Sequence, residues 1–131
     1  MTEVSIVIVS YNTCAAVERC IEAIRAQETN CEYRIIVVDN GSRDGTVERI
    51  RARWLDVSVV AAETNLGFAR ACNLGILQSS SEFILLLNSD TVVHAGAIDA
   101  LLGKLLQDKR VAVVGPRLIN LNGATESSFG S

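Results

Sequence analysis

Short runs of aliphatic and β-branched residues recur along the chain. Several of these runs are continuous rather than alternating, which is typical of strands that are covered on both faces of a sheet. The runs predict strands over five segments, which are residues 4–10, 33–39, 57–61, 82–87 and 111–115.

The segments between these runs predict helices. In each of four segments, apolar residues recur every three or four positions, as on the buried side of an amphipathic helix. The recurring positions are Val17, Ile21 and Ile24 in the first, Val47, Ile50 and Trp54 in the second, Phe68, Ala71, Cys72, Gly75 and Ile76 in the third, and Ile98, Leu101, Leu102 and Leu105 in the fourth. Strand and helix therefore alternate, and this order predicts an α/β fold with a mainly parallel sheet and helices on both faces.

The composition is that of a globular protein and argues against nucleic acid as a partner. The chain has 131 residues, of which 49% are hydrophobic, and its formal net charge is -3. This length suits a single domain over residues 1–131, and a nucleic-acid-binding surface would favour a basic excess. We expect the polar stretch 120–131 to be a tail or a truncated loop.

The cysteine pattern favours a cytoplasmic protein. Cys14, Cys20, Cys31 and Cys72 form no C-x-x-C pair and no zinc-type spacing with the single histidine, His94. We expect reduced thiols that pack as small apolar groups, and a surface position for His94. The amino-terminal residues lack the pattern of a secretory signal, and no apolar run approaches the roughly 20 residues that span a bilayer.

Ligands of parallel α/β sheets bind beyond the carboxyl ends of the strands. The first predicted strand runs into Ser10, Tyr11 and Asn12, without the glycines of the dinucleotide fingerprint G-x-G-x-x-G. The sequence also lacks a P-loop, so a bound phosphate would need a metal ion or an arginine. An NAD-dependent oxidoreductase is therefore disfavoured.

Asp39 directly follows the second run and opens the segment DNGSRDGT. A carboxylate at this place can accept hydrogen bonds from a nucleotide base or a ribose hydroxyl. The same residue types also build tight connections between a strand and a helix, so both roles stay open for Asp39. For Asp44 we favour a cap on the following helix.

The segment Asn88-Ser89-Asp90 follows the aliphatic run ILLL. Residues two positions apart in an extended segment project to the same side, so Asn88 and Asp90 are expected to face one ligand. A carboxylate and an amide suit Mg²⁺ or Mn²⁺ whose other positions are filled by phosphate oxygens and water. The alternative is that Asp90 caps a helix, although the β-branched residues after it are unsuited to a first helical turn.

The third helical segment carries a candidate phosphate ligand. It begins with an Asn-x-Gly turn and contains Arg70, whose guanidinium could meet a diphosphate near the helix start. A solvent-exposed helical arginine is the commoner situation. Gly67 and Gly75 are expected to allow close approach of backbone or ligand.

Taken in order, these motifs resemble a known family. The segments VSIVIVSYN, IIVVDNGSRDGT, NLGFARACNLGI, ILLLNSDTVV and VVGPRL are similar to those of family 2 inverting glycosyltransferases of the GT-A fold, in particular the bacterial rhamnosyltransferase-like group. The resemblance covers about residues 3 to 128. It implies a Rossmann-like fold that binds a nucleotide diphosphate sugar across the strand ends.

The resemblance also implies roles for particular residues. Asp90 matches the last, metal-binding acid of the family's Asp-x-Asp motif, whereas Asn88 departs from that motif by replacing its first acid. The implied cofactor is Mg²⁺ or Mn²⁺. The implied nucleotide-sugar contacts are Ser10, Tyr11, Asn12, Asp39, Arg70, Asn88 and Ser89.

The implied reaction is inverting, metal-assisted transfer of a sugar from a UDP or dTDP donor to a hydroxyl of a glycan or lipid-linked acceptor, in cell-wall or polysaccharide biosynthesis. The family's general base falls beyond Ser131, so we expect the donor-binding half of such an enzyme. A lipid-linked acceptor would add peripheral association with the inner face of the membrane. The alternative is a non-catalytic nucleotide-binding or interaction module, because a sheet that ends after its fifth strand leaves an open edge for self-association.

Overall fold

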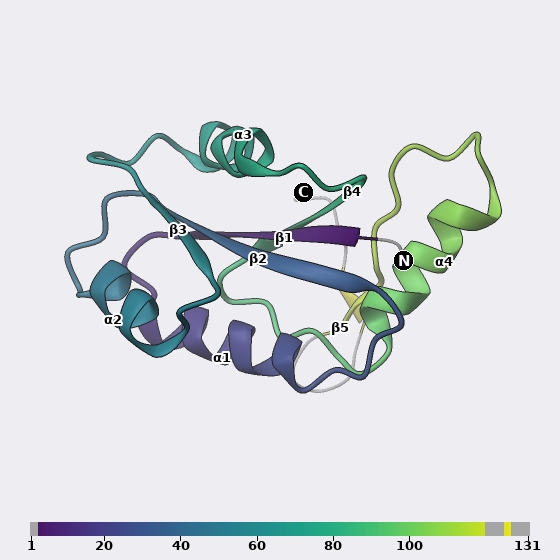
Figure 1. Ribbon diagram of the computed structural model, residues 1–131, viewed down its shortest axis with the longest axis horizontal. Coiled ribbons are helices and arrows are strands. Elements are labelled where there is room, and N and C mark those ends of the chain that lie inside the picture. Colours follow the sequence, from purple (N-terminus) through teal and green to yellow (C-terminus); the bar gives the residue numbers. More distant parts are fainter. Residues whose placement is uncertain (1–2, 120–124, 127–131) are drawn as a thin grey trace.

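The computed structural model describes residues 3–119 and 125–126. Its centre is a parallel sheet of four strands in the order β3-β2-β1-β4 (Figure 1). The strands are β1 (Glu3–Ser10), β2 (Glu32–Asp39), β3 (Ser58–Ala61) and β4 (Phe83–Asn88). The helices are α1 (Cys14–Arg25), α2 (Thr46–Arg53), α3 (Phe68–Gln78) and α4 (Ala97–Gln107). The predicted alternation of strand and helix is confirmed.

The two faces of the sheet are covered by different helices. The helices α1 and α2 lie on one side of the sheet and α3 lies on the other (Figure 1). Because side chains alternate along a strand, Ile6 and Ile8 of β1 pack with α1, whereas Val7 and Val9 pack with α3. The continuous apolar runs of β1 and β2 therefore serve two cores.

Gly75 allows α3 to approach the sheet closely. A Cβ atom at this position would lie 2.3 Å from Cγ1 of Val7 and 3.2 Å from Cγ2 of Val38. The prediction of close approach is confirmed for Gly75. At Gly67 a Cβ atom would meet no protein atom within 4 Å, so no backbone approaches closely there, and the predicted approach of a ligand stays a prediction. The φ of +82° at Gly67 lies in the left-handed region that favours glycine.

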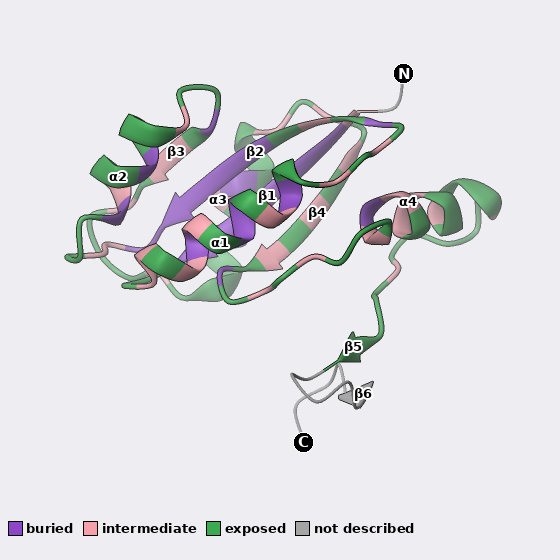
Figure 2. Cartoon of the chain, turned by 90° about the horizontal axis from the view of Figure 1, so that it is seen from below, coloured by how far each residue is buried: buried purple, intermediate pink, exposed green. Residues whose placement is uncertain are grey.

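The strand β4 differs from its neighbours because only one of its faces is well covered. Ile84 is 37% exposed and Leu86 is 43% exposed, and both lie on the face that α3 covers only over β1 and β2. The alternation of half-buried and exposed residues along β4 is visible in Figure 2. The prediction that this run is covered on both faces is wrong, since a continuous apolar run reports a preference for burial and not the presence of a covering element.

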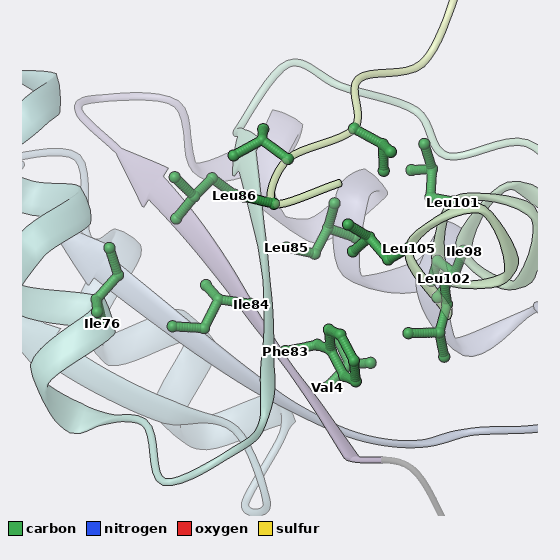
Figure 3. Close-up of a pocket in the computed structure, with 13 residues that line it drawn as sticks. Val4, Ile76, Phe83, Ile84, Leu85, Leu86, Ile98, Leu101, Leu102 and Leu105 are labelled. Atoms are coloured by element: carbon green, nitrogen blue, oxygen red, sulfur yellow. The ribbon is translucent and has the colours of Figure 1, made fainter. Parts of the chain in front are cut away.

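The segment 111–115, predicted as a fifth strand, is not a strand in the structure. Its residues instead line an apolar cavity of about 220 Å³ between β4 and α4 (Figure 3). Ala112, Val113 and Val114 share this lining with Leu85 and Leu101. Val113 is nevertheless 85% exposed, so the apolar character of this run ensures neither pairing in the sheet nor burial.

The carboxyl-terminal part of the chain forms a small separate sheet. The strands β5 (Leu118–Ile119) and β6 (Thr125–Glu126) pair in antiparallel fashion. The remainder of the polar stretch 120–131 lies outside the described residues. In the part that the structure describes, no helix has the length and apolar character needed to cross a membrane.

Candidate functional site

A crevice of about 400 Å³ lies at the carboxyl ends of β1, β2 and β4. The parallel arrangement brings these three strand ends to one edge of the sheet, as expected for a ligand site in this fold class. The crevice is lined by Val9, Tyr11, Thr13, Asn40, Asn65, Gly67, Phe68, Asn88, Ser89 and Asp90. Of the residues implied by the resemblance, Tyr11, Asn88, Ser89 and Asp90 therefore meet here.

The loop after β1 is held by reciprocal hydrogen bonds to the loop after β2. The backbone N–H of Asn12 donates to Oγ of Ser42 over 2.8 Å, and the backbone N–H of Arg43 donates to Oδ1 of Asn12 over 2.8 Å. Asn12 adopts a φ of +50°, a left-handed conformation that asparagine tolerates better than most residues. Asn12 thus joins two loops and does not line the crevice.

Asp39 is buried at the end of β2, with 1% of its surface exposed. Its Oδ2 accepts the backbone N–H of Ser42 over 2.8 Å, and its Oδ1 accepts the hydroxyl of Ser42 over 2.6 Å. These bonds are the turn chemistry that was one of the two roles left open for Asp39. The carboxylate is otherwise enclosed, and Asp39 is not among the residues that line the crevice.

Asn40, the next residue, lines the crevice and holds a neighbouring loop. Its side-chain Nδ2 donates to the carbonyl of Gly67 over 3.3 Å, and its Oδ1 accepts the backbone N–H of Leu66 over 3.2 Å. This buried amide therefore fixes the loop that leads into α3. The sequence assigned Asn40 no role, because its partners lie 26 and 27 residues away.

Asp44 links the starts of two helices. Its Oδ2 accepts the backbone N–H of Cys14 over 3.1 Å, and its Oδ1 accepts the backbone N–H of Thr46 over 3.2 Å and also the Thr46 hydroxyl. The hydroxyl of Thr46 and these backbone donors lower the pKa of Asp44. Gly45 occupies the N-cap position of α2, so Asp44 lies one residue before the cap position. Its carboxylate accepts backbone donors at the starts of both α1 and α2.

The segment after β4 is a turn rather than an extension of the strand. The backbone N–H of Thr91 donates to the carbonyl of Asn88 over 3.1 Å. The extended geometry predicted for Asn88 and Asp90 is therefore wrong, although both residues line the same crevice. The alternative that Asp90 caps a helix is also wrong, because α4 begins at Ala97.

The carboxylate of Asp90 lies close enough to α1 to affect a buried thiol. Burial raises the pKa of Cys20 to about 11, and the charge of Asp90 contributes to this shift. Asp90 itself is exposed. Within residues 3–119 and 125–126, no group of three or more His, Cys, Asp or Glu side chains is arranged to hold a metal ion. The available donors fit Mg²⁺ or Mn²⁺ that reaches the protein with a diphosphate, since Mg²⁺ is commonly bound by one or two carboxylates together with phosphates and water.

Several residues singled out by the sequence do not line the crevice. Ser10 is buried beneath it, and its hydroxyl lies 3.2 Å from that of Thr13. Arg70 is exposed on the first turn of α3. His94 is exposed, which confirms its predicted surface position, and its carbonyl accepts Nε2 of Gln27 over 2.6 Å.

The four cysteines are free thiols, as predicted. Burial, followed by the charge of Glu18, raises the pKa of Cys14. Burial also raises the pKa of Cys72. Neither thiol has the lowered pKa of a nucleophile.

The apolar cavity between β4 and α4 is a different kind of space. Figure 3 shows Ile84 and Leu86 on one side of β4 and Phe83 and Leu85 on the side of α4. The side chains around this cavity are all apolar. A nucleotide diphosphate needs polar partners, so the crevice at the strand ends is the candidate functional site.

Comparison with protein families identifies the family of the chain. The family model described as "Glycosyl transferase family 2" matches residues 5–128. The chain belongs to glycosyl transferase family 2. The resemblance drawn from the motifs is thereby confirmed.

The chain is similar to several curated members of the family. It is 33% identical over 95 residues to the glycosyltransferase AglE of Haloferax volcanii, which covers 70% of this chain and 31% of AglE. It is 27% identical over 140 residues to the N-acetylglucosaminyl-diphospho-decaprenol L-rhamnosyltransferase of Mycobacterium tuberculosis, which covers 98% of this chain and 45% of that enzyme. The chain therefore spans less than half the length of these relatives.

Solved structures confirm the GT-A fold. The structure of S. aureus TarS in complex with UDP-GlcNAc matches with a TM-score of 0.70 and 22% identity, over 82% of this chain and 32% of that chain. The mannosyltransferase PcManGT from Pyrobaculum calidifontis, in complex with GDP-Man and Mn²⁺, matches with a TM-score of 0.67 and 24% identity, over 80% of this chain and 32% of that one. At these identities the likeness shows the fold, with its parallel sheet and flanking helices.

Proposed function

We propose that this chain is the donor-binding part of a glycosyltransferase that moves a sugar from a nucleotide diphosphate sugar to an acceptor hydroxyl with inversion. The observation that carries the proposal is the crevice in which the ends of β1, β2 and β4 bring Tyr11, Asn40 and Asp90 together. Its volume of about 400 Å³ falls within the range of small-molecule sites, which is roughly 300–1,000 Å³.

The walls of the crevice suit a nucleotide sugar. Tyr11 is 49% exposed and Phe68 is 50% exposed, so each offers an aromatic surface to a base or a sugar ring. The amides of Asn65 and Asn88 add hydrogen-bonding groups to the lining. Asp39, fixed by Ser42, is the proposed partner of the base or ribose, and Arg70 is the proposed partner of the diphosphate. The donor class is UDP or dTDP, in line with the UDP-GlcNAc bound by TarS.

Asp90 is the residue that would hold Mg²⁺ or Mn²⁺, with Asn88 beside it. When bound, such a cation neutralises the negative charge that develops on the leaving diphosphate. Asp90 is exposed at the crevice, so phosphate oxygens and water can complete the coordination. The Mn²⁺ bound by the mannosyltransferase PcManGT supports this assignment.

Inversion requires a general base that takes the proton of the acceptor hydroxyl. The family resemblance assigns that base to a position beyond Ser131, so the residues described here bind and orient the donor. The proposed acceptor is a glycan or a lipid-linked saccharide, in keeping with the decaprenol-linked substrate named for the rhamnosyltransferase relative. We accordingly propose a cytoplasmic protein that associates peripherally with the membrane.

A second proposal, an interaction module of the same fold, is supported by β4. Its outer edge pairs with no strand among residues 3–119 and 125–126, and Ile84 and Leu86 on one of its faces are partly exposed. Such an edge favours pairing with another chain. Analytical ultracentrifugation distinguishes the two, because a monomer that binds nucleotide argues against an assembly role.

The donor-binding proposal is tested by thermal unfolding with UDP or dTDP, with and without Mn²⁺. We expect the nucleotide to raise the unfolding temperature more when Mn²⁺ is present, and Asp90→Ala to abolish the metal-dependent part. Glu82→Ala is the matched control, because it removes an exposed carboxylate directly before the opposite end of β4. The absence of any shift with either nucleotide would contradict the proposal.

A further inference from the structure

Thr13 connects the end of β1 to the turn that carries Asp90. Its Oγ1 lies 2.8 Å from Oγ of Ser89, which is 76 residues away in the sequence, and 3.2 Å from Oγ of Ser10. Ser10 and Ser89 are both buried, with 1% and 7% of their surfaces exposed. The three hydroxyls therefore form a continuous chain, of which Thr13 and Ser89 line the crevice.

Thr13 is at the N-cap position of α1 but does not cap the helix. A threonine at this position normally accepts a hydrogen bond from a backbone N–H in the first turn. In α1 the Thr13 side chain makes no such bond, and the first helical N–H, that of Cys14, is instead accepted by Asp44 over 3.1 Å. The hydroxyl of Thr13 is thereby free to bind Ser89.

Ser89 lies between Asn88 and Asp90, so its anchorage determines where these side chains point. The turn has a second support farther along, because Nε2 of Gln27 donates to the carbonyls of Val93 over 3.0 Å and His94 over 2.6 Å. Asp90 itself has no hydrogen bond or ion pair to other residues in the described part of the chain. The hydrogen bond between Thr13 and Ser89 thus holds the residue that directly precedes Asp90.

We propose that Thr13 is a positioning residue that holds the Asn88-Ser89-Asp90 turn in the geometry that binds the metal-diphosphate group of the donor. This inference rests on the proposed function, because it assumes that Asp90 binds the cation. Groups that orient metal ligands from outside the coordination shell typically change metal affinity by about 10–100-fold when removed. Thr13 would act in this way, through Ser89.

The test measures the affinity of the full chain for Mn²⁺ in the presence of UDP, by isothermal titration calorimetry and by the electron paramagnetic resonance of free Mn²⁺. Thr13→Val keeps the shape of the side chain and removes the hydroxyl, and we expect it to raise the Mn²⁺ dissociation constant about tenfold. Thr13→Ser restores the hydroxyl and should bind Mn²⁺ within about twofold of the wild type.

Ser89→Ala removes the other partner of the same hydrogen bond. We expect it to weaken Mn²⁺ binding as much as Thr13→Val does, and the double variant to be no weaker than either single one, because residues that act through one contact are not additive. If Thr13→Val fails to fold by circular dichroism, the comparison of Ser89→Ala with the wild type decides the inference.

Three results would overturn the inference. Wild-type affinity in Ser89→Ala or in folded Thr13→Val would show that the hydrogen bond does not position Asp90. Equal losses in Thr13→Ser and Thr13→Val would show that the hydroxyl is not the group that matters. A wild-type protein that binds UDP but shows no Mn²⁺ dependence would overturn both the metal role of Asp90 and the positioning role of Thr13. Normal Mn²⁺ binding by the variants would overturn the positioning role of Thr13 alone.

Discussion

The backbone N–H of Asn12 donates a 2.8 Å hydrogen bond to Oγ of Ser42, which lies 30 residues further along the chain. The same hydroxyl donates to Oδ1 of Asp39 over 2.6 Å. One side chain therefore couples the left-handed backbone of Asn12 to the buried carboxylate of Asp39. The loops after β1 and β2 form a single hydrogen-bonded unit under the crevice.

This coupling predicts that Ser42→Ala is destabilising. The substitution removes a donor from the Asp39 carboxylate and an acceptor from the N–H of Asn12, and a buried group that loses its partner costs about 1–3 kcal/mol. We expect a loss of this size in the free energy of unfolding, measured with urea. Ser80→Ala, at an exposed position, is the control and should change stability by less than about 0.5 kcal/mol. Equal stability of the two variants would contradict the prediction.

The close packing of α3 predicts opposite effects for two glycine substitutions. In Gly75→Ala the new methyl group would meet Val7 and Val38, whose buried side chains have little freedom to move, and such overpacking costs about 1–3 kcal/mol. At Gly103 of α4 a Cβ atom meets no heavy atom within 4 Å. Gly103→Ala should therefore stabilise the protein by up to about 1 kcal/mol, through helix propensity. Urea unfolding checks both values, and a stable Gly75→Ala protein would disprove the close contact.

The lowered pKa of Asp44 predicts a stability change in acid. A carboxyl whose pKa is lower in the folded protein stabilises the fold above its unfolded value, which is 3.8 for the ordinary group. This contribution disappears as the pH falls through the folded value. The unfolding temperature of the wild type should therefore exceed that of Asp44→Asn at pH 6, and the difference should shrink below pH 4. A difference that does not change between these pH values would show that the charge of Asp44 is not involved.

The raised pKa of Cys20 predicts the opposite pH dependence. A thiol whose pKa rises from 9.0 to about 11 on folding stabilises the protein below pH 9, and this contribution is lost as the pH rises toward 11. The wild type should lose stability between pH 8 and pH 10.5, and Cys20→Ala should lose less. Asp90→Asn removes a neighbouring negative charge, and its loss of stability should lie between those of the wild type and Cys20→Ala. Urea unfolding at both pH values provides the measurement.

Much of the fold was predictable because the apolar patterns report burial directly. The apolar runs predict the strands β1, β2 and β4, and helical spacing predicts the buried positions of Ile21 and Ile50. The same patterns gave a wrong result for 111–115 and for the second face of β4. A pattern of apolar residues does not specify which element covers them. Both wrong predictions concern the covering element.

The candidate site was predictable only where position along a strand determines it. Tyr11, Asn88 and Asp90 follow strand ends, and the topology alone brings them to one crevice. Thr13 and Ser42 were missed because their roles depend on partners 76 and 30 residues away. The local context of Thr13 is that of an ordinary helix N-cap, a role that its hydroxyl does not perform.

The uneven coverage of the sheet implies that the two halves of the crevice differ in the exchange of their amide hydrogens. Asp39 ends β2, which is paired on both sides, whereas Asn88 ends β4, which is paired on one side only among the described strands. Because protection from exchange follows burial and pairing, amides of β2 should exchange only through global opening and those of β4 through local opening as well. The side of the crevice at the end of β2 would then keep its structure when the donor binds, and the side that carries Asp90 would adjust.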